Sequence, residues 1–242
     1  RIRNTLRFLL SNMNGFDPKQ NMVAQDDLLA LDRWVVAEAL TLQNELKELY
    51  LTYQYHTAVQ KIHKFCSETL GGFYLDIIKD RQYTTQADSL ARRSCQTAMY
   101  HIVEAMTRWI APILSFTADE VWENIPGEHA DMGVFTATWY EHLFDYHSEN
   151  ADAELWRKLL VIREHSSTVL ETLRKDSKIG SSLDAEVVVY CDDELINALE
   201  IVSEELRFIL ITSEVTLAKL EDVPEGCELK MLTDDAESGQ FA

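Results

Sequence analysis

Apolar side chains recur every three or four positions through the first half of the chain, which is the spacing of an amphipathic helix. A short run over residues 1–13 stops at the Gly-Phe-Asp-Pro turn of residues 15–18. A longer run over residues 28–53 follows Asp26 and Asp27, either of which can cap a helix. The pattern therefore predicts one short helix and one helix long enough to span a domain.

Glycine and proline divide the next stretch of this half. A third apolar run begins near His56, and the pair Gly71-Gly72 predicts that the helix breaks there before apolar positions resume. A fourth helix is expected to begin at Asp88 or Ser89 and to end before Pro112.

Thr117 and Glu120 have the spacing of a capping box, in which a hydroxyl and a carboxylate each bind a free backbone amide at the start of a helix. We therefore expect a short fifth helix that opens at Thr117 and ends before Pro126. Helices with apolar faces and short connections bury those faces together in a bundle. The fold predicted for residues 1–130 is a helical bundle.

The apolar pattern changes after a polar stretch, which we interpret as a linker over residues 131–151. A helix is predicted next, and runs of β-branched residues then indicate strands. The helix covers 153–175, strands cover 184–191 and 214–218, short helices cover 194–199 and 204–209, and a third strand can form at 227–232. Residues 152–242 are thus expected to form a helix plus a small α+β domain, in a chain that is mainly α.

Composition narrows the class of protein. Apolar residues make up 46% of the chain, which excludes intrinsic disorder, and only 8 Gly and 4 Pro in 242 residues disfavour an all-β fold rich in tight turns. No apolar run approaches the roughly 20 residues that cross a bilayer, so we expect a cytoplasmic protein without membrane contact. The four cysteines stand apart with no CxxC pair, which favours reduced thiols over zinc ligands. Because the chain opens in helical period without Met, we interpret it as a piece of a longer polypeptide.

The charge is unevenly spread along the chain. The net charge of −19 argues against a polyanionic partner, but residues 1–125 carry 13 Lys and Arg against 15 Asp and Glu, whereas residues 126–242 carry 9 against 26. The first sixteen residues hold Arg1, Arg3 and Arg7 and no carboxylate. Either a locally positive binding surface or an ordinary solvated helix face fits this opening.

Motifs for catalysis do not occur in the sequence. The seven histidines lack metal-binding spacing, and there is no glycine-rich phosphate loop or serine nucleophile motif. Residues 175–181, Lys-Asp-Ser-Lys-Ile-Gly-Ser, are similar to the lysine loop that holds ATP phosphates in class I aminoacyl-tRNA synthetases. The segment follows a helix rather than a parallel nucleotide-binding sheet, so we interpret it as a helix C-terminus with Gly180 turning the chain. We assign no catalytic residue and no metal ligand.

Basic and aromatic residues gather in groups suited to RNA, since unpaired bases stack on aromatic or guanidinium planes while Lys and Arg neutralise phosphates. For each group the alternative is surface charge that pairs within the bundle. The groups are Arg1/Arg3/Asn4/Arg7, Lys61/Lys64, Lys79/Arg81/Gln82/Tyr83 and Arg92/Arg93.

Four longer strings are more specific than any periodicity: RIRNTLRFLLSNM at 1–13, ALDRWV at 30–35, FYLDIIKDRQY at 73–83 and IAPILSFTADEVW at 110–122. In order and spacing they closely resemble the anticodon-binding region of bacterial isoleucyl-tRNA synthetases, which are class I aminoacyl-tRNA synthetases. Ile162-Arg163 and residues 178–188 resemble the junction domain that follows the bundle in the same enzymes.

The resemblance implies a domain that holds the anticodon stem and loop of isoleucine tRNA, within a parent ligase that attaches isoleucine to that tRNA. The rest of the synthetase chain would be its second partner, and a monomer is expected. ATP, magnesium and structural zinc are implied for the parent alone, because its catalytic and editing motifs and its C-terminal zinc cysteines do not occur here. This segment is therefore expected to be inactive by itself.

The resemblance also implies which residues contact tRNA. Alternatives that remain open are the same domain of a valyl, leucyl or methionyl relative, a helical module whose acidic half docks basic proteins, and a helical-bundle metalloenzyme. The implied contacts are Arg1, Arg3, Asn4 and Arg7, with Lys61, Lys64, Arg92 and Arg93 as lesser phosphate contacts.

Overall fold

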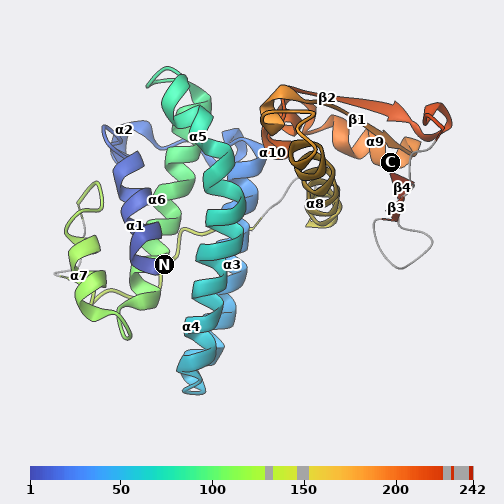
Figure 1. Ribbon diagram of the computed structural model, residues 1–242. Helices are drawn as coiled ribbons and strands as arrows, with labels where there is room; N and C mark the ends of the chain where they lie inside the picture. Colours follow the sequence, from blue (N-terminus) through green and yellow to red (C-terminus); the bar gives the residue numbers. More distant parts are fainter. Residues whose placement is uncertain (129–132, 146–152, 226–229, 232–239, 242) are drawn as a thin grey trace. The chain divides into compact units, whose positions relative to one another are not determined.

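Helices dominate the computed structural model, which describes residues 1–128, 133–145, 153–225, 230–231 and 240–241 (Figure 1). Contacts divide the chain into two units, residues 1–146 and 147–242, and the strands found in the described residues all belong to the second. The predicted fold, mainly α with a small α+β part, is confirmed.

The first unit is a bundle arranged around its central helix, α6 (Leu90–Ile110), which packs against α1, α3, α5 and α7. Nearly every α6 side chain from Ser94 onward is buried, because its neighbours cover it on several faces. The other elements are α1 (Ile2–Asn12), α2 (Pro18–Asn21), the 3₁₀ turn η1 (Gln25–Asp27), α3 (Ala30–Leu51), α4 (Tyr55–Lys64), η2 (Phe65–Tyr74), α5 (Leu75–Thr84) and α7 (Ser115–Trp122).

The chain does not break at Gly71-Gly72, and that prediction is wrong. Helix α4, the π-helical segment η2 and α5 follow one another without interruption. A Cβ atom at Gly71 would collide with the guanidinium of Arg1 and would stand 2.9 Å from the carbonyl oxygen of Cys66. The Cys66 carbonyl of the widened helical turn and the Arg1 side chain thus leave no room for a Cβ atom at Gly71.

Tertiary contacts replace one predicted helix cap and leave another in place. Asp26 and Asp27 lie in η1 and do not cap α3, whose N-cap is Leu29. The Leu29 amide instead donates to the Ser94 hydroxyl of α6, with a nitrogen–oxygen distance of 2.9 Å. The Ser89 cap of α6 is confirmed, since its hydroxyl accepts a bond from the amide three residues later.

The capping box predicted at Thr117 is also wrong. Helix α7 begins two residues earlier, at Ser115, with Leu114 as an N-cap that makes no side-chain hydrogen bond. Thr117 and Glu120 consequently lie inside the helix, where their side chains are available for contacts with α1.

Residues 133–145, which we assigned to a linker, pack on the bundle. Val134, Tyr140 and Leu143 are buried. Gln43 of α3 donates its side-chain amide to the Tyr140 carbonyl at 2.8 Å, and the Tyr140 hydroxyl lies 2.8 Å from His101 Nδ1. A few apolar side chains thus anchor a stretch whose average composition is polar; residues 131–132 and 146–151 of the predicted linker lie outside the described part.

The second unit combines a long helix with a small sheet in the order β2-β1-β4-β3. Strands β1 and β2 are parallel, and β4 runs antiparallel to both β1 and β3. The third predicted strand is represented by β3, and its remaining residues, Cys227 included, lie outside the described part. The elements are α8 (Ala153–Lys175), η3 (Ser182–Asp184), β1 (Glu186–Cys191), α9 (Asp193–Glu200), α10 (Ser203–Leu210), β2 (Glu214–Lys219), η4 (Leu220–Asp222), β3 (Lys230–Met231) and β4 (Gln240–Phe241).

The segment at residues 175–181 is a helix C-terminus, as predicted, since it connects α8 to η3 and no strand precedes it among the residues that the structure describes. The turn, however, is made by Ser177 and not by Gly180. Ser177 has a left-handed φ of 57°, and its amide donates a hydrogen bond to the Arg174 carbonyl oxygen at 3.0 Å.

Candidate nucleic-acid interface

A groove of about 390 Å³ runs between α1 and α7 in the first unit. Helix α1 is amphipathic, so Leu6 and Leu9 are fully buried while its arginines stay exposed. The groove has polar and charged walls with two apolar side chains among them. It is lined by Arg3, Arg7, Leu10 and Ser11 from α1 and by Thr117, Glu120, Val121 and Asn124 from α7 and the turn after it.

Arg3 and Glu120 bridge this groove with a two-pronged ion pair. Arg3 Nη2 lies 2.7 Å from Glu120 Oε1, Arg3 Nη1 lies 2.6 Å from Oε2, and the Thr117 hydroxyl oxygen lies 3.5 Å from Nη1. The two side chains are 60% and 56% exposed, so water screens the pair and its contribution to stability is at most about 1 kcal/mol. A phosphate, which offers the same paired oxygens, can therefore replace the carboxylate on Arg3.

Arg7 supplies the second cation of the groove, one helical turn beyond Arg3. Its side chain is exposed and makes no hydrogen bond or ion pair with any residue that the structure describes. Arginine donors that no carboxylate occupies are open to an anionic ligand.

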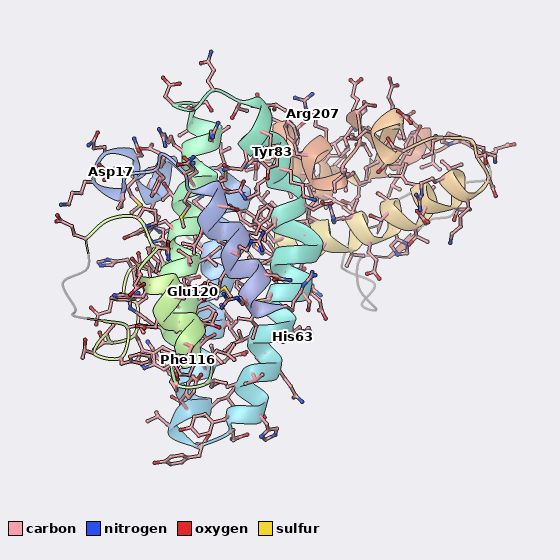
Figure 2. All side chains as sticks on the ribbon, turned by 60° about the vertical axis from the view of Figure 1, so that its left-hand side comes forward. Asp17, His63, Tyr83, Phe116, Glu120 and Arg207 are labelled. Atoms are coloured by element: carbon pink, nitrogen blue, oxygen red, sulfur yellow. The ribbon has the colours of Figure 1, made fainter. Side chains whose placement is uncertain are left out.

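Phe116 adds an aromatic ring to α7, one turn before Glu120. Figure 2 labels both residues on this helix, and the Phe116 side chain is 93% exposed. The apolar face of α7 consists of Ala118, Val121 and Trp122. Phe116 lies off that face, and an apolar residue out of phase with its helix is the signal that sequence reasoning missed.

The groove of free and exchangeable arginines beside an exposed ring agrees with the comparison to known proteins. A family model described as the anticodon-binding domain of tRNA ligase matches residues 32–189, more than half of the chain. The chain belongs to this anticodon-binding family. The matched residues include α7 and do not include α1.

Curated relatives of this anticodon-binding domain carry the name isoleucine–tRNA ligase. The protein of Idiomarina loihiensis is 55% identical over 225 residues, that of Actinobacillus pleuropneumoniae 54% over 230, and that of Haemophilus influenzae 53% over 227. Each comparison covers 93% of this chain and 24% of the relative. The chain thus spans about a quarter of the length of these relatives.

The other α1 residues predicted to bind tRNA face different surroundings. Arg1 caps α1 and its guanidinium lies against Gly71 of η2. Burial raises the pKa of the nearby Cys66 thiol to about 11, and the Thr5 hydrogen bond and Arg1 oppose that rise. Asn4 is exposed, and its side chain makes no hydrogen bond within the described residues. Within the predicted α1 set, only Arg3 and Arg7 line the groove.

The lysines predicted as lesser contacts are paired with carboxylates. Lys61 Nζ lies 2.8 Å from Glu45 Oε2, and Lys64 Nζ lies 3.7 Å from Glu68 Oε2. Both lysines are on α4 and do not line the groove of the anticodon-binding domain. Their arrangement matches surface charge paired within the bundle.

The two arginines at the start of α6 differ from each other. Arg93 donates to the Gly15 carbonyl at 3.3 Å and to the Gln96 side chain at 2.9 Å, so it ties α6 to the end of α1. Arg92 is partly exposed, and its guanidinium makes no bond within the described part. Neither lines the α1–α7 groove.

The cluster at residues 79–83 does not form one surface. Arg81 and Gln82 are 4% and 3% exposed, and Arg81 pairs with the buried Asp32. Lys79 is exposed and donates a hydrogen bond to Asp76, while Tyr83, labelled in Figure 2, is 68% exposed. The prediction of an RNA-binding group is wrong for Arg81 and Gln82, because the phase of α5 turns these two side chains toward α3 and α6.

The described residues contain no group of three or more His, Cys, Asp or Glu placed to hold a metal ion. Among their helices, none combines the length and the apolar character that a membrane crossing requires.

Proposed function

We propose that this chain binds the anticodon stem and loop of isoleucine tRNA, as part of an isoleucine–tRNA ligase. The observation that carries the proposal is the pair of arginines in the α1–α7 groove: Arg7 is unpaired in the described structure, and Arg3 is held by an exposed, exchangeable carboxylate. Membership of the anticodon-binding family and the similarity to three isoleucine–tRNA ligases support the nature of the ligand.

The chain would act by positioning RNA. Phosphate oxygens bind the guanidinium groups of Arg3 and Arg7 and fix the register of the anticodon arm. Unpaired loop bases then meet groups that form hydrogen bonds, such as Glu120 and Asn124. Holding one end of the tRNA orients the distant acceptor end toward a catalytic domain elsewhere in the ligase.

The parent's activity, attachment of isoleucine to tRNA at the expense of ATP, belongs to segments other than these residues. We assign ATP, magnesium and structural zinc to those segments, and we place the ligase in the cytoplasm as a monomer. We assign the parent ligase to isoleucine, and not to valine, leucine or methionine, because the relatives cited above carry the name isoleucine–tRNA ligase at 53–55% identity.

Binding of an isoleucine tRNA anticodon stem-loop tests the proposal. We expect Arg7→Gln to weaken binding at least about tenfold, since a hydrogen bond to a charged group contributes about 1.5–3 kcal/mol. The slope of log affinity against log salt should become shallower by about 0.7–0.9, the change for one lost phosphate contact. Titration by fluorescence anisotropy at several salt concentrations measures both quantities.

Arg157→Gln is the matched control, because Arg157 is an exposed arginine of α8 in the second unit, paired with Glu154. This control should bind RNA like the wild-type chain. If both variants lost RNA affinity equally, the effect would come from net charge alone, and the proposal that the α1–α7 groove binds RNA would be wrong. Binding of basic proteins that ignores added tRNA would favour the protein-docking alternative.

A further inference from the structure

Phe116 has the most exposed large apolar side chain in the described part of the chain, at 93%. Burying a phenylalanine side chain stabilises a protein by about 1.5–3 kcal/mol, and this one contributes none of that to the bundle. Its helix already has an apolar face in Ala118, Val121 and Trp122. Packing within the first unit therefore does not account for Phe116.

The position of Phe116 relates it to the groove. Glu120 follows it by four residues on α7, so the two side chains share one face, with Cβ atoms about 5–6 Å apart. Glu120 lines the groove and bonds Arg3, and Thr117, next to Phe116, lines it as well. Figure 2 labels Phe116 and Glu120 one above the other on α7. The ring thus stands at the rim of the groove.

The surroundings select one type of ligand. The groove beside Phe116 combines the apolar side chains of Leu10 and Val121 with charged and amide groups, which are Arg3, Arg7, Glu120 and Asn124. Its occupant must therefore offer apolar area and polar, charged groups at once. A nucleobase has an apolar face for the ring and a polar edge for carboxylate or amide groups, and its phosphate pairs with arginine. Charge and shape together match an unpaired nucleotide.

We propose that Phe116 stacks on one unpaired base of the RNA loop that the α1–α7 groove holds. The inference rests on the proposed function and deepens it, because it assigns a base-stacking residue to the site. Arg3 and Arg7 bind the phosphates beside that base, and Glu120 accepts hydrogen bonds from its edge. Phe116 itself contributes no charge.

The test uses the 242-residue chain and isoleucine tRNA anticodon stem-loops that carry 2-aminopurine at one loop position at a time. Stacking on an aromatic ring quenches 2-aminopurine, so one position should lose fluorescence when wild-type protein binds. Phe116→Ala should abolish this quenching and weaken binding about 5- to 150-fold, the range for one base–aromatic stack. The slope of affinity against salt should stay unchanged, because no phosphate contact is lost.

Phe116→Trp should keep both the quenching and the affinity, since it preserves a stacking plane. Phe135→Ala is the matched control, because Phe135 is 61% exposed and does not line this groove. It should leave binding and quenching as in the wild type. All three variants should melt at the wild-type temperature, because each alters a largely exposed side chain.

The outcomes separate the two proposals. If the wild-type chain shows no salt-dependent binding to the stem-loop, the proposed function fails. If wild type binds but Phe116→Ala behaves like Phe135→Ala, the stacking inference alone is overturned. Weaker binding of Phe116→Ala with the quenching intact also overturns it, since the ring would then contact something other than a base.

Discussion

Two arginine–carboxylate pairs in the bundle have the same chemistry and opposite surroundings. Arg81 and Asp32 join α5 to α3 with side chains 5% and 0% exposed, while Arg3 and Glu120 join α1 to α7 with side chains 60% and 56% exposed. The buried pair is isolated from solvent and the exposed pair is open to exchange with a ligand. Burial, and not residue type, separates a structural ion pair from a binding site.

The buried pair is one part of a larger polar network. Asp32 accepts hydrogen bonds from Tyr74 of η2 at 2.7 Å, from Ser94 of α6 at 2.5 Å and from Arg81 of α5 at 3.3 Å. Burial, followed by the nearby Asp32 carboxylate, holds the pKa of Tyr74 well above its usual value. One buried carboxylate on α3 thus forms hydrogen bonds to η2, α5 and α6.

Asp32→Asn should have the largest effect on stability, because it removes the charged partner from the buried Asp32–Arg81 ion pair. Breaking one partner of a buried ion pair costs about 3–5 kcal/mol. The free energy of unfolding, measured by urea titration followed by tryptophan fluorescence, checks this value. A loss below about 1 kcal/mol, typical of an exposed pair, would remove the contrast between the two sites.

A second way to probe the buried interior is acid. Burial, with a smaller contribution from His142, lowers the pKa of His101 to about 4, and its Nδ1 lies 2.8 Å from the Tyr140 hydroxyl. The unfolded chain therefore binds this proton more tightly than the fold does, with a histidine pKa of about 6.5. The contribution of neutral His101 to the free energy of unfolding is fully present above about pH 6.5 and is lost as the pH falls toward 4.

When the pH is lowered from 7 to 5, His101 should decrease the free energy of unfolding of the wild-type protein by about 2 kcal/mol, at about 1.4 kcal/mol per pKa unit. The comparison is with His101→Asn, which cannot take up the proton. Urea unfolding at both pH values gives the two differences. Identical pH dependence in wild type and variant would show that His101 titrates normally.

Glu120→Gln should have the smallest effect on stability, below about 1 kcal/mol, because its ion pair is exposed. The same change removes the carboxylate that competes for Arg3 and keeps an amide oxygen as acceptor, so binding of the anticodon stem-loop should tighten a few-fold. The salt slope should not steepen, because the number of phosphate contacts is unchanged. Anisotropy titration beside a urea melt measures both. Weaker RNA binding would mean that the carboxylate itself is essential to the ligand, and a large loss of stability would contradict the comparison.

Local patterns predicted much of the fold. Apolar periodicity located α1, α3, α6 and α8, and the β-branched run Val187-Val188-Val189 marked β1. Prediction failed where a distant residue satisfied a local need: Ser94 supplies the cap bond at Leu29, and Arg1 explains Gly71. Such contacts join residues 65 or more positions apart, which no local pattern encodes.

For the α1–α7 groove, the sequence singled out Arg3 and Arg7 but not Glu120, which pairs with Arg3. Thr117 and Glu120 have the spacing of a capping box, and only the packing of α7 on α1 shows that they meet Arg3 instead. In the sequence Arg81 is a basic residue like Arg3, but in the structure it lies in the core. Helical phase was insufficient to separate them, because α5 is covered by neighbours that the sequence does not place.

The sequence by itself determined the helical class, the concentration of acid in the second half and the strings shared with anticodon-binding domains, because side-chain type and spacing are local properties. Only the tertiary structure decided which arginines are available to a ligand. Availability depends on burial and on counterions brought from other helices. Asp32 takes Arg81 out of solvent, whereas the α1–α7 groove leaves Arg7 unpaired within the described structure and Arg3 exchangeable.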